Sequence, residues 1–265
     1  MAEITENGYI GKEYQKAFDR IREENQLLFS LAGTINSFCH EVLGNIVKVR
    51  SNNIQEITAI LLFIRVHEAF QGCILLARKG MISSASMISR CMIDPVCILK
   101  LISEKPEFVR DYILSSKRDK LNILKKAKKI GVDDIENIEE DIKSLSEEID
   151  SHCIPVLTST KLLEDAGLFK RYGSAFVCLS EYIHSTSRNL EEEYMVLNDS
   201  REVECIIAGP KDKNLDRLIV SVITFVIDSM DSISTIFNIE LSKTEKYKKE
   251  LLDIHEMKLK SDSDK

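Results

Sequence analysis

The sequence predicts an all-α protein, organised as a single-domain bundle of about eight to ten helices. Glycine and proline are scarce, with 10 and 4 among 265 residues, whereas the many turns of an all-β fold need both. Apolar residues recur at steps of three, four and seven along most of the chain, which is the spacing of amphipathic helices. No segment alternates apolar and polar residues convincingly, as a strand would.

Residues 1–53 are expected to supply N-terminal helices that pack on the bundle. Their apolar positions predict one long helix or two stacked helices over 11–49, with Gly33 and Gly44 as candidate breaks. Residues 54–79 follow as a helix that is apolar almost all round. That pattern is typical of a central, buried element.

The core bundle, residues 54–240, continues with a helix over 81–94 that carries many small side chains. Pro95 should kink this helix or start a new one, because its ring clashes with the carbonyl four residues back and it has no N–H. The buried stripe of this region is expected at Ile82, Ala85, Ser89, Met92, Val96 and Leu99.

Two helices of opposite charge come next. The helix over 106–130 carries a basic run from Lys117 to Lys129. Residues 133–150 are strongly acidic and have a narrow apolar stripe, which predicts a peripheral helix that rests one face on the body. A connector then leads to a short helix, with Thr158 or Ser159 as its N-cap.

The last part of the chain predicts an amphipathic helix, a buried helix and a charged one. The amphipathic helix is expected over 169–186, with a buried stripe at Tyr172, Phe176, Leu179 and Ile183. A loop-like segment at 198–214 leads to the deeply buried helix over 215–239. Residues 241–265 should form a charged helix followed by a disordered tail. The two most apolar helices, 54–79 and 215–239, lie far apart in sequence, and a compact bundle would bring them together at its centre.

The composition excludes several classes of protein. A formal net charge of −7 argues against general DNA binding, which draws on excess Lys and Arg. Seven cysteines without a CxxC pair fit a reduced cytoplasm better than a disulfide scaffold. The N-terminus is polar, and the apolar runs at 57–64 and 218–227 are shorter than the roughly 20 residues that span a bilayer. We therefore expect a cytoplasmic protein with no membrane partner.

The motifs of the common cofactor- and metal-dependent enzymes are missing from the sequence. It contains no GxxxxGK[ST], GxGxxG, HExxH or GxSxG pattern. No Cys/His cluster has the spacing of a zinc site. We therefore expect neither a cofactor nor a bound metal ion.

Arg90 and Asp94 form the first candidate site. They lie four residues apart and share a helix face, with Ser86 one turn earlier. On the functional interpretation, the carboxylate holds an arginine whose planar fork faces an anion. On the structural interpretation, which the sequence favours, they form a solvated ion pair worth ~0.3–0.5 kcal/mol.

His184 is the second candidate. Ser180, His184 and Arg188 align at i, i+4 and i+8 of the predicted helix, Tyr182 lies in the same segment, and Glu181 can reach the imidazole. Such partners would orient a general acid/base histidine. The alternative is a histidine that interacts with the last carbonyls of its helix.

Glu68, Lys117 and Lys120 complete the candidate binding residues. Glu68 is polar inside an apolar helix, where polar groups need partners, so it could orient Arg90 across a helix interface. Lys117 and Lys120 begin the basic run and could face phosphates. The alternatives are purely structural: Glu68 pairs with a neighbouring side chain, and the two lysines lie on a solvated helix face.

Three stretches of the chain carry a family resemblance: SRCMIDPVCILKLI (89–102), YILSSKRDKLNIL (112–124) and YGSAFVCLSEYIHSTS (172–187). Together they resemble an uncharacterised all-helical family of bacterial proteins, a domain of unknown function. That family pairs an Arg-x-x-x-acid helix with a later Ser-x-Tyr-x-His segment. Arg90 and Asp94 match the first motif, and Ser180, Tyr182 and His184 match the second. The resemblance implies a helical fold, and it brings no activity with it.

A more distant resemblance is to HEPN-type ribonucleases, small helical bundles that cut RNA without metal and use an Arg-x(4–6)-His motif. The chain departs from that motif, because Arg171 lies too far before His184 and Arg188 follows it. A HEPN-like site here would need Arg90 to supply the cation from another helix. The resemblance then implies His184 as the acid/base and Arg90 as the stabiliser of phosphate charge.

These features predict a helical binding or regulatory module of a bacterial stress or phage-defence system, with a polar pocket near Arg90 and His184. The alternative is a metal-independent, HEPN-like ribonuclease that uses the same two residues on RNA. A protein partner or a homodimer is also expected, with the acidic helix 133–150 and the charged C-terminal helix as contact surfaces.

Overall fold

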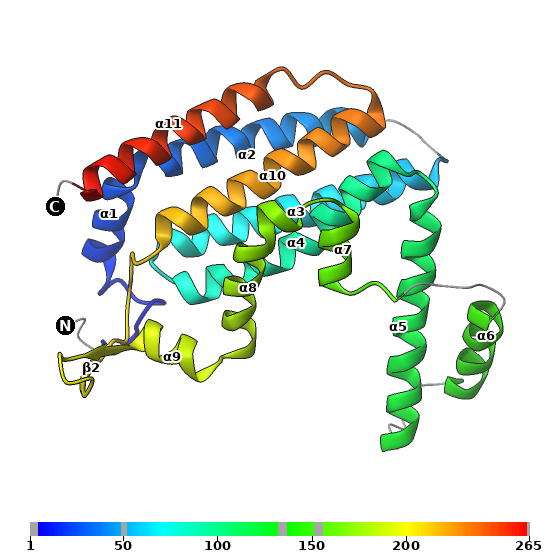
Figure 1. Cartoon of the computed structure of the whole chain (residues 1–265), viewed down its shortest axis with the longest axis horizontal. Helices are drawn as coiled ribbons and strands as arrows, with labels where there is room; N and C mark the ends of the chain where they lie inside the picture. Colours follow the sequence, from blue (N-terminus) through cyan, green and yellow to red (C-terminus); the bar gives the residue numbers. More distant parts are fainter. Residues whose placement is uncertain (1–4, 49–51, 132–136, 151–155, 264–265) are drawn as a thin grey trace.

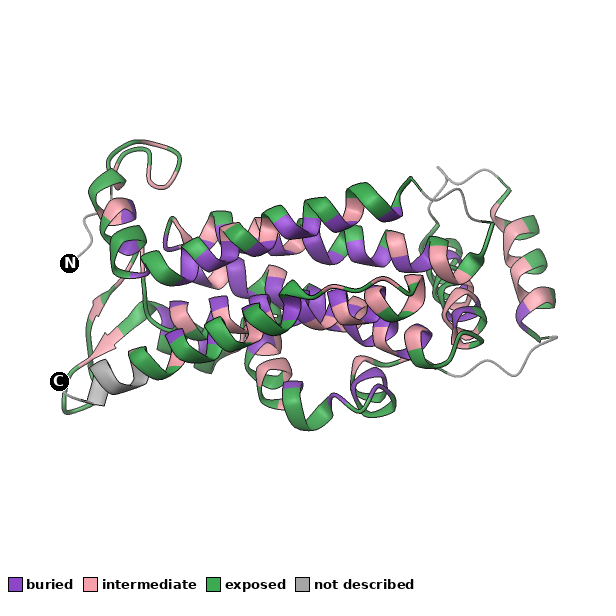
Figure 2. Cartoon of the chain, turned by 90° about the horizontal axis from the view of Figure 1, so that it is seen from above, coloured by how far each residue is buried: buried purple, intermediate pink, exposed green. Residues whose placement is uncertain are grey.

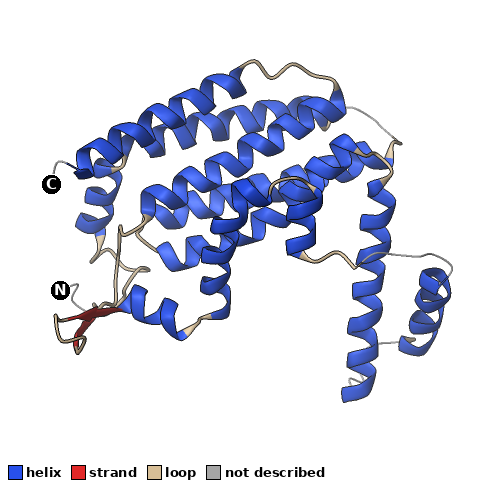
Figure 3. Cartoon of the chain, in the orientation of Figure 1, coloured by secondary structure: helices blue, strands red, loops and turns tan. Residues whose placement is uncertain are grey.

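The computed structural model describes residues 5–48, 52–131, 137–150 and 156–263, with side chains described up to residue 258. Within these residues the chain forms eleven helices and one two-stranded sheet (Figures 1 and 3). The helices are α1 (Gln15–Glu24), α2 (Gln26–Ile46), α3 (Ile54–Ala77), α4 (Ile82–Glu104), α5 (Phe108–Ile130), α6 (Ile138–Asp150), α7 (Ser159–Asp165), α8 (Phe169–His184), α9 (Ser187–Tyr194), α10 (Leu215–Phe237) and α11 (Lys243–Ser263). The strands are β1 (Met195–Leu197) and β2 (Val203–Ile206). The all-α prediction is confirmed, with one helix more than the upper expected number.

Five long helices form the bundle. α3 packs against α4 and α10, while α2 and α11 contact each other and α10 (Figure 1). Buried residues concentrate along the facing sides of these helices, and exposed residues lie on their outer sides (Figure 2). The two most apolar helices, α3 and α10, are in contact at the centre of the bundle, as their composition predicts.

α3 and α10 are also long and apolar enough to cross a membrane, judged by length and composition alone. A central helix of a water-soluble bundle has the same properties, since it is apolar on most sides. The most apolar window is 56% buried in α10 and 44% buried in α3. α3 therefore keeps more of its apolar surface outside the core.

α5 and α6 together form an arm that extends from the bundle, and we call it the α5–α6 arm (Figure 1). The two helices share a small core of their own, made by Leu114, Leu121 and Ile149 with Ile142 and Leu145. The peripheral acidic helix with a narrow apolar stripe is thus confirmed, but its apolar face rests on α5 rather than on the body of the bundle. Its predicted first residues, 133–136, lie outside the described residues, as do Cys153 and Pro155.

The candidate breaks at Gly33 and Gly44 are wrong, and Pro95 does not start a new helix. α1 and α2 separate at Asn25, whose side chain donates to the Ile21 carbonyl at 3.0 Å. Gly33 and Gly44 lie inside α2. Pro95 lies inside α4 without ending it, because the packing of this helix on α3 and α10 offsets one missing backbone hydrogen bond.

The buried stripe predicted on α4 is confirmed, since all six of its residues are buried. The stripe on α8 is confirmed in part. Tyr172 and Leu179 are buried, Phe176 is partly buried, and Ile183 is 44% exposed. α8 ends at His184, two residues earlier than expected, and Ile183 near its end is already partly in contact with solvent.

The segment after α8 departs most from the prediction. No helix is predicted where α9 lies; Thr186 caps this helix by accepting the Asn189 N–H at 3.3 Å. It also misses the antiparallel hairpin of β1 and β2, in which Met195 pairs with Ile206. Strands of three and four residues are too short to produce a recognisable alternation of apolar and polar residues.

α11 closes the bundle. Tyr247, Leu251 and Ile254 are buried and lie at steps of four and three, so a single narrow stripe docks this charged helix on α2 and α10. The helix continues to Ser263, beyond the expected start of the tail. The six cysteines within the described residues are all free thiols.

Candidate functional site

One face of α4 organises the candidate site. Ser83, Ser86, Arg90 and Asp94 are spaced by three or four residues, so they lie along a single side of the helix. α4 packs on α7 and α8, and this polar side reaches residues of both helices. We call this arrangement the polar seam.

Arg90 is held by three helices at the polar seam. Its Nε donates to the Ser180 hydroxyl at 3.2 Å, and its Nη1 donates to the Asp94 carboxylate at 3.3 Å. Its Nη2 donates to the Ser159 hydroxyl at 2.9 Å. The guanidinium also lies over the Phe176 ring, 4.4 Å from the centroid, which is a favourable position for a cation. Only 12% of the Arg90 side chain is exposed, so its fork already has protein partners.

Ser159 closes this cluster, a role that no pattern in the sequence predicts. Its hydroxyl accepts from Arg90 and donates to Asp94 at 2.9 Å. Ser159 is the first residue of α7, whose N-cap is Thr158. The cap signal locates this turn correctly, but Ser159 lies 65 residues from Asp94 along the chain. Nothing local in the sequence indicates that they meet.

His184 is the last residue of α8 and is exposed. Within the described residues it makes no hydrogen bond or ion pair, with Glu181 or any other side chain. It lies one helical turn beyond Ser180, which is about 6 Å along the helix axis. Ser185 is left-handed with φ 47° and ends the helix, and Arg188 belongs to α9. The expected alignment of Ser180, His184 and Arg188 on one helix is therefore wrong beyond His184.

Tyr182 belongs to a second polar cluster at the start of α4. Its hydroxyl donates to Glu193 Oε1 at 2.7 Å, and the Ser83 hydroxyl donates to Glu193 Oε2 at 3.4 Å. Lys211 Nζ lies 3.7 Å from Glu193 Oε2 and 3.7 Å from the centre of the Tyr194 ring. The side chains of Glu193 and Lys211 are only 4% and 13% exposed.

Burial controls the titration of this second cluster. Desolvation lowers the pKa of Lys211, although the Glu193 carboxylate opposes that shift. Desolvation raises the pKa of Tyr182, and its hydrogen bond to Glu193 raises it further. Glu193 and Lys211 escape the sequence analysis because they lie in or beside the segment read as a loop.

A cavity of about 240 Å³ opens beside the second cluster, at the start of α4. It is lined by Tyr9, Gly80, Met81, Ile82, Ser83, Ser84, Tyr194, Ala208, Gly209 and Lys211. The N-cap of α4 is Met81, which offers no side-chain acceptor to the first backbone N–H groups of the helix. Lysine, hydroxyl groups and uncapped backbone donors therefore converge on one hollow.

Gly80 makes the wall of this cavity. Its φ of +68° is a conformation that side chains rarely adopt, and an added Cβ would lie 2.7 Å from the Lys211 backbone. The Lys211 N–H donates to the Gly80 carbonyl at 3.0 Å. The turn before α4 thus fixes where Lys211 enters the cavity.

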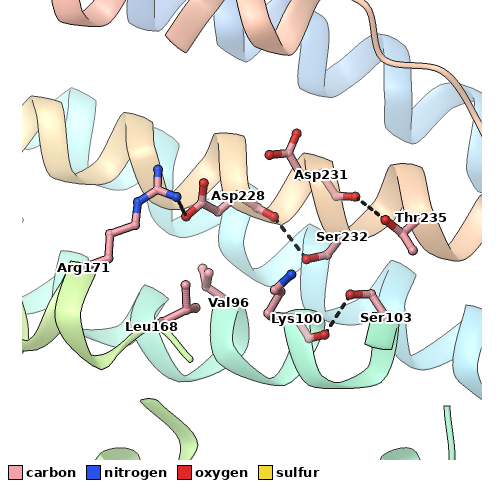
Figure 4. Close-up of a pocket in the computed structure, with 9 residues that line it drawn as sticks. All are labelled: Val96, Lys100, Ser103, Leu168, Arg171, Asp228, Asp231, Ser232 and Thr235. Atoms are coloured by element: carbon pink, nitrogen blue, oxygen red, sulfur yellow. Dashed lines mark hydrogen bonds and ion pairs between the residues drawn. The ribbon is translucent and has the colours of Figure 1, made fainter. Parts of the chain in front are cut away.

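A smaller cavity, of about 150 Å³, lies between α4, α8 and α10 (Figure 4). Arg171 pairs with Asp228 at 3.0 Å, and the Tyr172 hydroxyl donates to the same carboxylate. Burial raises the pKa of Asp228, although both neighbours favour its anion. These partners satisfy the buried carboxylate, so this group joins α8 to α10 as a structural unit.

Glu68 does not reach Arg90. It pairs with Arg65 at 3.7 Å on the outer face of α3, where the two side chains are 71% and 64% exposed. The role expected for Glu68 as the residue that orients Arg90 is therefore wrong. The physical reason is that position 68 lies on the one side of α3 that the bundle leaves uncovered.

The basic run of α5 faces the acidic helix α6. Lys117 pairs with Glu148, Lys120 lies 3.8 Å from Asp141, and Lys128 pairs with Glu139 at 2.7 Å. The acidic side chains neutralise part of the edge that could have faced phosphates. They also give α6 a contact surface within its own chain.

His67 belongs to a polar group between α2 and α3. Its Nε2 lies 2.8 Å from Asn36 Oδ1, and its ring meets the His40 ring at 4.7 Å between centroids. The Gln71 amide contacts Asn36 and both imidazoles. Burial lowers the pKa of His67 to about 4, and the nearby His40 adds to that shift. The described part of the chain contains no group of three or more His, Cys, Asp or Glu side chains that could hold a metal ion.

Comparison with known proteins gives a family and no named relative. Residues 56–203 match the model of a family of unknown function (DUF5677). No curated protein and no solved structure matches the chain. The matched segment holds Arg90, Asp94, Ser180 and His184 and covers more than half of the 265 residues. The chain therefore belongs to this family of unknown function, in agreement with its resemblance to an uncharacterised all-helical family.

Proposed function

We propose that the protein is a helical binding module whose ligand carries a small anionic group, and that the cavity at the start of α4 receives this group. The observation that carries the proposal is the convergence of Lys211, Ser83, Tyr194 and the uncapped first turn of α4 on one hollow of about 240 Å³. A helix N-terminus and a lysine both favour negative charge.

The chemistry of the lining supports binding. Lys211 supplies a cation whose position Glu193 and the Tyr194 ring fix, so little side-chain entropy is lost when a ligand arrives. The Ser83 and Tyr194 hydroxyls are joined by a 3.2 Å hydrogen bond and can turn toward an anion. A perturbed lysine in a hollow is also typical of functional sites.

The Arg90 cluster supports the same proposal from the other end of the polar seam. Arg90 donates to three protein acceptors and stacks on Phe176, so it positions α7 and α8 on α4. A rigid seam keeps Tyr182, and through it Glu193 and Lys211, in a fixed place. Arg90 acts here as a positioning residue.

The proposal is tested by calorimetric titration of the full chain with inorganic phosphate and, separately, with acetate. We expect saturable binding of at least one anion by the wild type, and a loss of at least about tenfold in affinity for Lys211→Gln. Lys211→Arg keeps the charge and should retain part of the affinity.

Lys213→Gln is the matched control. This substitution removes the same charge two residues away from Lys211. The Lys213 Nζ donates to the Glu192 carbonyl at 3.1 Å, and the side chain does not line this cavity. It should bind as the wild type does. Absence of saturable binding by the wild type, or equal affinity of the two glutamine variants, would overturn the proposal. Far-UV circular dichroism checks that Lys211→Gln folds.

A metal-independent ribonuclease is the second candidate, and one observation favours it. Arg90 contacts Ser180, which lies one helical turn from the exposed imidazole of His184, so the cation and the imidazole belong to neighbouring parts of the polar seam. The test is incubation of the pure protein with RNA and a chelator. This candidate requires cleavage by the wild type and its loss in His184→Ala. Equal, background cleavage by both proteins removes it.

A further inference from the structure

The outer face of α3 carries a row of large aliphatic side chains that the bundle does not cover. Ile54, Ile57, Leu61, Ile64 and Leu75 expose 55%, 38%, 62%, 41% and 63% of their surface. The opposite side of α3 packs against α4 and α10. The helix is therefore apolar on two sides, and within the described residues the bundle covers one of them. We call this row the α3 stripe.

The α3 stripe has the spacing of a helix–helix seam. Positions 54, 57, 61, 64, 68, 71 and 75 alternate steps of three and four, which is the pattern that two packed helices share. The row spans about 32 Å at 1.5 Å per residue. Its two polar members are Glu68 and Gln71. Gln71 is already satisfied by Asn36 and the two imidazoles.

The charges beside the α3 stripe are complementary to those of a second, antiparallel copy of the helix. Arg65 and Glu68 are 64% and 71% exposed and stand at the middle of the row. A two-fold axis beside residues 66 and 67 would place Arg65 of one copy against Glu68 of the other, twice. The same axis sets Ile57 near Leu75 of the second copy, because 57 and 75 are centred on residue 66, within one residue of the centre between 65 and 68. A parallel arrangement would instead set Glu68 against its own copy, which costs free energy.

We propose that the α3 stripe is a homodimer interface, in which α3 packs antiparallel on α3 of a second copy of this chain. This inference is independent of the anion-binding cavity. It also differs from the homodimer surfaces that the sequence suggests, because α6 already packs on α5 and α11 already packs on α2 and α10. A row of about 32 Å on each copy provides the extended contact that a stable dimer needs.

A lipid surface is the other occupant to consider, since α3 is apolar and long enough to cross a membrane by composition. Arg65 and Glu68 argue against it. Both charged side chains stand on the exposed face at the middle of the helix, where a bilayer would place them at its most apolar depth. In a dimer each of them gains a second opposite charge, from the other copy, beside the partner it has within its own helix.

The experiment is light scattering coupled to gel filtration on the full chain, with Leu61→Asp as the interface variant. The wild type is expected at twice the chain mass of 30.2 kDa, and Leu61→Asp at the mass of a single chain. Leu252→Asp is the matched control, because Leu252 on α11 is exposed to the same 62% as Leu61 but lies off the α3 stripe. It should remain dimeric.

A charge swap tests the antiparallel arrangement. Arg65→Glu alone should raise the dimer dissociation constant at least about tenfold, because it sets two carboxylates together. Arg65→Glu combined with Glu68→Arg should restore the wild-type value. A monomeric wild type at its highest soluble concentration overturns the proposal, as does a Leu61→Asp variant that stays dimeric. Flotation of a monomeric wild type with phosphatidylcholine vesicles would assign the α3 stripe to lipid instead.

Discussion

Arg90 in the bundle and Lys128 in the α5–α6 arm are both basic residues on helix faces, yet they differ in burial and in the number of their partners. Arg90 exposes 12% of its side chain and contacts α4, α7 and α8. Lys128 exposes 53% and meets only Glu139 of α6. The first is part of a joint between three helices. The second is one of three ion pairs along the edge of two helices.

The difference follows from water. A charge that is removed from water must be matched by hydrogen-bonding partners, because an unpaired buried charge costs several kcal/mol. The partners of Arg90 therefore come in a defined geometry and from distant parts of the chain. A charge that stays in water loses little if its partner is absent. A basic residue is thus a determinant of tertiary structure in the bundle and a minor contributor to stability in the arm.

Replacement of Arg90 should have the largest effect on this comparison. Arg90→Ala removes three hydrogen bonds, to Asp94, Ser159 and Ser180, and the stacking on Phe176. We therefore expect a loss of about 2–3 kcal/mol in the free energy of unfolding. Urea denaturation followed by circular dichroism measures it. Arg188→Ala is the control, since Arg188 is 73% exposed and pairs only with Glu192 at 2.9 Å. Its loss should stay below about 0.5 kcal/mol. Equal losses would mean that the polar seam stabilises the protein no more than an exposed ion pair does.

Acid should weaken the bundle through His67, which is the second effect in size. The pKa of His67 is lowered from 6.5 to about 4 by burial, so between these values the unfolded chain binds more protons than the folded one. Stability is then full above the unfolded pKa and is lost as pH falls from 6.5 toward 4. His40, Asn36 and Gln71 face the same imidazole.

The measurement is the urea midpoint at about pH 7 and about pH 4.5, compared between variants. His67→Gln should flatten the change between the two conditions, whereas His184→Gln, at an exposed position, should keep it. A wild type whose midpoint does not fall over this range contradicts the assignment to a buried, neutral imidazole.

Disruption of the α5–α6 arm should have the smallest effect. Lys128→Ala removes a pair in which the side chains are 53% and 76% exposed, so the free energy of unfolding should change by less than about 1 kcal/mol. The change should shrink further in high salt, because exposed charges are screened. Hydrogen exchange of the α6 amides measures the local effect. Lys125→Ala is the control, because Lys125 has no ion pair within the described residues. Global unfolding by Lys128→Ala would show that the arm is integral to the bundle.

Much of the fold is predictable from the sequence, because helices are specified locally. The apolar stripe of α4, the cap at Thr158 and the narrow stripe of α6 each depend on neighbours within a few residues. α9 and the hairpin could not be predicted, since short elements leave too few residues to establish a period. The continuation of α4 through Pro95 could not be predicted either, because packing against other helices offsets the tendency of proline to end a helix.

The candidate site is predictable only in part. The sequence nominates Arg90 with Asp94 as one candidate, and Ser180 separately as a partner of His184. In the fold Ser180 contacts Arg90 instead, and Ser159, Glu193 and Lys211, which the sequence does not nominate, complete the two polar clusters. A single hydroxyl or carboxylate in a turn carries no periodic signal. Its role appears only when a helix more than sixty residues away is placed against it.

The sequence by itself determined that this protein is helical, that α3 and α10 are its most apolar helices, and that α6 is peripheral. These properties depend on the spacing of apolar and charged residues within each helix. Only the tertiary structure decided that Arg90 is enclosed by three helices, that Glu68 and Arg65 face outward beside the α3 stripe, and that Lys211 enters the cavity at the start of α4. Burial and the choice of partner depend on which faces meet, and that is a property of the whole packed chain rather than of any one segment.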